Sequence, residues 1–172
     1  MTRWPALPYA EWKDTRDTLH MQLQVVGKVR LALSPLEPQW ANVPLYLTAR
    51  GLWTSPLPFG SRTFDAEFDL FAHALVLRAS DGGEDRVPLG GAVADFHDAV
   101  MAALRGLGID VAISELPSEV PDPVPFPEDR EHHTYVPVPV PPAAKAAGYR
   151  VVQRGGSPSP KPDAASGIGG RR

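Results

Sequence analysis

The chain has 172 residues, enough for one domain with little room for a second. It contains no cysteine, which excludes a disulfide framework, a thiolate metal site and a cysteine nucleophile. The apolar content of 43% is that of a globular protein, and the sequence shows neither a signal peptide nor a membrane-spanning run. We therefore expect a cytoplasmic protein with no membrane partner.

The formal net charge of −3 hides a change of sign along the chain. Residues 1–116 carry ten basic and fourteen acidic residues, residues 117–134 carry one and five, and residues 135–172 carry six and one. The acidic balance before residue 135 argues against nucleic acid as a specific partner. The basic end contains Tyr135 and Tyr149 but no aromatic residues interleaved with its charges, so it would bind phosphates only unspecifically.

A long helix is expected from Ala10 to Leu33, because apolar residues recur there at helical spacing. Ser34-Pro35 ends it, since the residue before proline disfavours helical backbone. The predicted apolar stripe is Trp12, Thr15, Leu19, Leu23, Val26 and Leu33, widened by Val25 and Val29.

Alternating apolar and polar residues predict strands at 43–50, 62–70, 75–78 and 86–89. Gly51 breaks or bulges the first of these, with a continuation through 52–54. The proline and glycine content of residues 55–60 predicts a loop. Turns are expected at 72–73 and 81–83, and Pro88 suits an edge strand.

A second helix is expected over residues 93–107 and a last short strand over 109–116. The order predicts an α+β fold, with helices covering one face of a four- to five-stranded antiparallel meander. We expect a compact α+β domain over 1–116 and a proline-rich extended arm over 117–135. The arm either docks through Val120, Val124 and Phe126 or is a solvated linker. Residues 136–172 are expected to be a disordered tail.

One face of the first helix carries His20, Gln24 and Lys28 at helical spacing. An imidazole, an amide and an amine in a row can hold an anionic ligand or transfer protons. The alternative, which helical statistics favour, is a solvated polar face.

Gln22 and Arg30 fall inside the apolar arc of the same helix. A buried arginine requires a carboxylate partner, and the strand at 62–70 offers Asp65, Glu67 and Asp69 on one face. Arg50 and Arg62 compete for the same acids by cross-strand pairing. This pattern favours a structural ion network over a catalytic one.

The sequence gives no support for a metal or cofactor. Same-face carboxylates on a strand are about 7 Å apart, which is wide for one small ion. The adjacent His132 and His133 fit a linker better than a metal site, and His97 fits the surface of the second helix. Phosphate-loop, dinucleotide and serine-nucleophile motifs are lacking as well.

Two long runs, residues 12–21 and 24–32, resemble an uncharacterised bacterial family, domain of unknown function 5996 (DUF5996). Shorter matching runs lie at 43–51, 93–96, 103–111 and 121–130, so the resemblance covers about residues 4–135. The resemblance implies no catalytic residue, because the family has no established activity. It does imply that members continue into a second, aromatic-rich half that is missing here.

The abrupt change in composition after Tyr135 suggests a frameshift near codons 133–136 as one origin of the tail. A natural variant with a genuine tail is the alternative. Under the first, the chain is truncated and its sheet presents an edge or apolar face to the missing half.

Two functions follow as hypotheses, and a non-functional fragment is the third possibility. The first is a non-enzymatic module that binds a small molecule or a protein. The second is half of an enzyme whose site needs the missing half. For either, the candidate binding residues are His20, Gln24, Lys28, Arg30 and Arg50.

Overall fold

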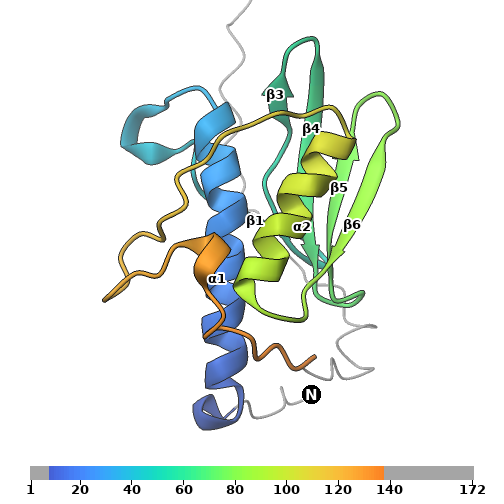
Figure 1. Ribbon diagram of the computed structural model, residues 1–172. Coiled ribbons are helices and arrows are strands. Elements are labelled where there is room, and N and C mark those ends of the chain that lie inside the picture. The colour runs from blue at the N-terminus through green and yellow to red at the C-terminus, as the bar shows by residue number, and fades with distance from the viewer. Residues whose placement is uncertain (1–7, 138–172) are drawn as a thin grey trace, which may run out of the picture.

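The computed structural model describes residues 8–137, in which two helices cover one face of an antiparallel sheet (Figure 1). The helices are α1 (Tyr9–Leu33) and α2 (Val93–Gly106), with short 3-10 helices η1 (Pro38–Trp40) and η2 (Phe126–Glu128). The strands are β1 (Tyr46–Leu47), β2 (Gly51–Trp53), β3 (Leu57–Phe59), β4 (Arg62–Asp69), β5 (Ala74–Ala79) and β6 (Glu84–Pro88). The α+β class is confirmed, whereas the predicted tail, residues 136–172, lies outside this range from residue 138 onward.

The sheet has the order β1-β2-β4-β5-β6, with β3 also paired to β4. The predicted strand over 43–50 is wrong, because the chain reverses after Leu47 and Tyr46 pairs with Trp53. The Thr48 hydroxyl closes this reversal by accepting hydrogen bonds from the backbone N–H of Arg50 and Gly51, each at 3.0 Å. A side-chain turn of this kind interrupts an otherwise strand-like pattern.

The predicted loop over 55–60 is also wrong, since its second half forms β3. Gly60, with φ of 59°, turns the chain so that Leu57 pairs with Phe64. Leu57 is buried beneath the helices. Pro58 is tolerated because β3 pairs only with β4 and its outer side needs no donor.

The predicted last strand over 109–116 does not form. Ile109 is buried in the core, but the segment lies outside the sheet. The Glu115 carbonyl accepts a 2.8 Å hydrogen bond from the Phe126 N–H instead. The segment therefore finds its backbone partner in the arm.

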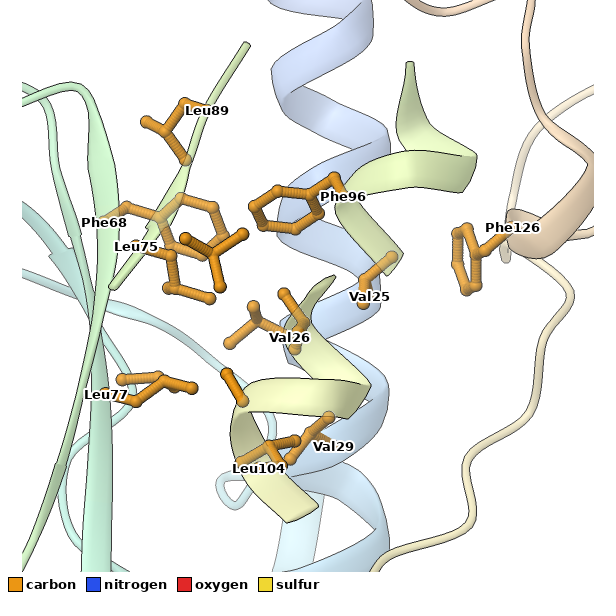
Figure 2. Close-up of a cluster of buried hydrophobic side chains, with 14 of the residues drawn as sticks. Val25, Val26, Val29, Phe68, Leu75, Leu77, Leu89, Phe96, Leu104 and Phe126 are labelled. Atoms are coloured by element: carbon orange, nitrogen blue, oxygen red, sulfur yellow. The ribbon is translucent and has the colours of Figure 1, made fainter. Parts of the chain in front are cut away.

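The core lies between the sheet and the two helices (Figure 2). Phe68 of β4 stacks on Phe96 of α2 with ring centroids 6.3 Å apart. The buried face of α1 is rotated from the predicted stripe, so that Leu19 and Leu23 are only partly buried. Gln22 is fully buried, and its amide donates a 3.1 Å hydrogen bond to the Leu89 carbonyl. No helix among residues 8–137 is long and apolar enough to cross a membrane.

The arm docks on both helices, which decides between the two predicted alternatives. Phe126 is completely buried, and the partly buried Val120 packs against the core. Ala92 directly precedes α2, and its methyl side chain cannot accept a hydrogen bond from the first turn of the helix. The arm supplies the cap, because Val93 N–H donates to the His132 carbonyl at 3.0 Å and Ala94 N–H to the Asp129 carbonyl at 2.9 Å. Two carbonyl groups of the arm thus accept hydrogen bonds from N–H groups in the first turn of α2, which have no partner within the helix.

Candidate functional site

The predicted polar row on α1 is where the arm attaches. Gln24 donates to the Ser118 carbonyl at 3.0 Å and accepts from the Ser118 N–H at 2.7 Å. Lys28 Nζ donates to the Ser118 hydroxyl at 2.6 Å. Gln24 and Lys28 therefore bind a segment of their own chain, and only His20 of the row lines a hollow in the surface.

That hollow is the α1–arm groove, with a volume of about 400 Å³. One wall is the first half of α1, and the other is the proline-rich arm. Its apolar surface comes from Met21, Val120 and Val124 and from prolines 117, 121 and 123. The polar lining residues are Arg16, Asp17, His20, Asp122, Asp129, Glu131 and His132.

Two of the four carboxylates in the groove are already paired. Asp17 accepts hydrogen bonds from Lys13 at 2.8 Å and from Arg16. The hydrogen bond from Lys13, then that from Arg16, lowers the pKa of Asp17 despite partial burial.

Asp129, the second paired carboxylate, is 1% exposed and accepts from His132 Nδ1 at 2.8 Å and from two backbone N–H groups at 3.1 Å. This pair fixes the His132 ring in the groove wall.

Asp122 and Glu131 lie in the groove without a side-chain hydrogen bond or ion pair among residues 8–137. Among the described residues, Arg16 is the only arginine or lysine in the lining, and Asp17 already engages it. The groove thus carries excess negative charge beside an apolar floor. This combination is complementary to a cation with an apolar body.

Arg30 does not take the predicted carboxylate partner. Its guanidinium is buried, donates to the Asn42 carbonyl at 2.7 Å and to Ser55 Oγ at 3.1 Å, and lies over the Tyr46 ring. Arg30 therefore holds the loop that precedes β1. It contacts neither groove described in this part of the chain.

Arg50 belongs to an ion network on the sheet face opposite the helices. It pairs with Asp69 at 2.6 Å, and Arg78 pairs with Glu67 at 3.1 Å and Asp65 at 3.4 Å. Arg62, which was also expected there, pairs with Asp81 instead. Side chains in this network are matched to one another, which favours the structural interpretation.

The Asp69 carboxylate should make the free energy of unfolding depend on pH in the acidic range. Burial raises the pKa of Asp69, but hydrogen bonds from Arg50 and from the N–H groups of Ala72 and Phe71 lower it below the ordinary 3.8. The stabilisation is present above that value and disappears as the pH falls through the depressed pKa. We expect Asp69→Asn to lower the free energy of unfolding at neutral pH, and the difference from the natural chain to shrink below about pH 4.

Urea unfolding at several pH values measures this difference. The exposed Asp110→Asn is the control and should leave the curve unchanged. A deficit for Asp69→Asn that stays constant down to about pH 2 would show that the carboxylate charge is not what stabilises the fold.

A second hollow, the α2 groove, has a volume of about 470 Å³ and lies between α2 and residues 112–115. It is lined by His97, Asp98, Met101, Arg105, Ala112, Ile113 and Glu115. The expectation that His97 lies on the surface is wrong, because Phe126 of the arm covers it and leaves 7% exposed. Neither lining set within residues 8–137 includes a serine, threonine or tyrosine hydroxyl.

The remaining histidines have structural partners. His73 lies in the turn before β5, as predicted, and contacts the Tyr135 hydroxyl at 3.1 Å. Burial raises the pKa of Tyr135. His133 contacts backbone carbonyls of its own turn. Within the described residues, no three acidic or histidine side chains gather closely enough to hold a metal ion.

The groove residues that sequence reasoning did not assign to a site include Asp122, Asp129, Glu131 and His132 in one groove and Asp98 and Arg105 in the other. The only signal for the first set was the His132-His133 pair beside three acids. These residues form part of a groove only because the arm packs against α1, which the sequence alone does not indicate.

Comparison with known proteins identifies a family but indicates no activity. The model of a family described as "Family of unknown function (DUF5996)" matches residues 4–147. The match continues past Tyr135, the point where the composition changes. No curated protein and no solved structure matches the chain.

Proposed function

The chain belongs to the family of unknown function DUF5996, and from that premise we propose that it is a non-enzymatic binding module for a small organic cation. The observation that carries the proposal is the α1–arm groove. Its volume of about 400 Å³ falls in the range of small-molecule sites, roughly 300–1,000 Å³.

The charge distribution selects the ligand class. Glu131 and Asp122 are exposed carboxylates that face the groove with no cationic partner among residues 8–137. Met21, Val120 and Val124 supply apolar contact beside them. An ammonium group gains a charge-assisted hydrogen bond from such a carboxylate while its apolar body leaves water.

The site is built for binding rather than for reaction. His132 is held by Asp129, but the lining residues within 8–137 offer no hydroxyl or thiol for it to activate. His20 contacts Gln24 at 3.4 Å and completes the polar rim. Of the five residues predicted for binding, only His20 supports this site directly, while Gln24 and Lys28 support it by holding the arm.

The experiment is a titration of the purified full chain with 2-phenylethylammonium chloride, followed by NMR. We expect binding with a Kd of about 1 mM or tighter, and shifts at Met21 and Val124. The anion of similar shape, 3-phenylpropanoate, should bind at least about tenfold more weakly. Equal binding of cation and anion, or no binding of the cation, would contradict the proposal.

Glu131→Gln is the decisive variant, because the residue is exposed and its side chain makes no hydrogen bond or ion pair among residues 8–137, so we expect the fold to be retained. We expect a loss of affinity of about five- to tenfold. Glu128→Gln is the matched control, since Glu128 is also an exposed acid of the arm but does not line the groove. A Glu131→Gln affinity equal to that of the control would exclude the groove as the site.

A further inference from the structure

The α2 groove contains an imidazole that is fixed in position. The ring of His97 stacks on Phe126 with centroids 6.5 Å apart and planes at 20°. His97 Nδ1 lies 3.0 Å from Asp98 Oδ1. Because a carboxylate only accepts hydrogen bonds, this contact places the proton of the neutral ring on Nδ1, and in that tautomer Nε2 carries a lone pair.

Nε2 of His97 is not engaged by the described part of the chain. Nε2 has no hydrogen-bond partner within residues 8–137. The buried side-chain nitrogen and oxygen atoms without a partner in the same range are Gln22 Oε1 and Asn42 Nδ2 only. His97 Nε2 therefore keeps some exposure although the residue is largely buried, and His97 lines the groove. Asp98 and Glu115 add two carboxylates to the lining.

The other charge in the groove is Arg105. His97, Met101 and Arg105 follow one another at intervals of four residues, so they lie on the same face of α2. Eight residues of helix correspond to about 12 Å. Arg105 makes no ion pair among residues 8–137. Met101 and Ile113 lie in the lining and supply apolar surface.

We infer that the α2 groove binds a short extended peptide with free termini. Its ammonium group donates to His97 Nε2 and to Asp98, and its carboxylate accepts from the Arg105 guanidinium. An extended tripeptide spans about 10–11 Å, which matches the separation of these groups along the helix. The central side chain packs on Met101 and Ile113.

The probe is the tripeptide Ala-Leu-Ala, added to the full chain while the His97 ring and backbone signals are followed by NMR. We expect a Kd of about 1 mM. Acetylation of the N-terminus and amidation of the C-terminus should each weaken binding at least about fivefold. Equal affinity of the capped peptides, or no binding of the free one at about 10 mM, would overturn the inference.

Arg105→Gln tests the carboxylate contact without disturbing the core, because the residue is exposed. We expect about fivefold weaker binding of the free peptide and no further loss on amidation. The control is Arg86→Gln, an exposed arginine on β6 that lies outside the groove. Glu131→Gln should leave tripeptide binding unchanged, which separates this site from the α1–arm groove. Unchanged affinity in Arg105→Gln would overturn the inference.

Discussion

Replacing Phe126 with alanine should lower the free energy of unfolding by about 3–5 kcal/mol. The side chain is completely buried, belongs to the main core cluster and stacks on His97. Its loss leaves a cavity where the arm meets α2, and it frees the arm residues that cap that helix. Urea or thermal unfolding of the full chain measures the change.

Leu116→Ala is the control for this substitution. Leu116 is also a large apolar residue next to the arm, but it is 49% exposed. Its replacement should change stability by less than about 0.5 kcal/mol. If Phe126→Ala costs no more than Leu116→Ala, the arm is not part of the folded core.

Replacing Gly51 with alanine should destabilise the fold by about 3 kcal/mol or more. Gly51 pairs with Asp69 of β4, and a Cβ atom there would lie 1.9 Å from the Phe68 carbonyl oxygen. Backbone of a central strand cannot move aside as a flexible side chain can. The β2–β4 pairing must therefore distort, which unfolding by denaturant will report.

Gly27→Ala is the matched control, with the opposite sign expected. Gly27 lies inside α1, and nothing stands within 4 Å of its Cβ position. Alanine there should stabilise the protein by up to about 1 kcal/mol, because it favours helical backbone. Equal changes in the free energy of unfolding for the two substitutions would contradict the close approach of Gly51 to the Phe68 carbonyl oxygen.

Sequence reasoning predicted well those helices and strands whose apolar residues recur at a regular spacing within the element itself. The periodicity of α1 and the alternation in β4 each extend over many residues, so a single interruption does not hide them. Pro88 was expected at an edge, and β6 is the edge strand that contains it.

The errors arise where partners far apart in sequence decide the structure. Leu57 to Phe59 forms a strand because β4 lies beside it, although its proline indicates a loop. Residues 109–116 have strand-like composition, but they lie outside the sheet, and the Phe126 N–H of the arm supplies a partner for the Glu115 carbonyl.

The candidate site shows the same division. The row of His20, Gln24 and Lys28 was visible from helical spacing, but its partner Ser118 lies 94 residues beyond Gln24. Arg30 was correctly placed inside the apolar arc, and its partners proved to be a carbonyl, a hydroxyl and a ring. Long-range pairing of this kind leaves no local trace in a sequence.

Both proposed sites depend on one feature, the docked arm. It forms a wall of the α1–arm groove, and its Phe126 fixes His97 in the α2 groove. Its contacts with α1 include Thr134 N–H to the Thr18 hydroxyl at 3.1 Å, and Val136, the residue directly after the arm, donates to the Thr15 hydroxyl at 3.1 Å.

Native-state hydrogen exchange of the full chain, resolved by residue, tests this docking most directly. Docking predicts that the amide protons of Ser118, Phe126 and Thr134 are protected, since each donates a hydrogen bond across the interface. Val93 and Ala94, which donate to arm carbonyls, should exchange slowly as well. Exchange of all five at the rate of an unstructured peptide, with β4 and β5 still protected, would contradict docking and remove the basis of both sites.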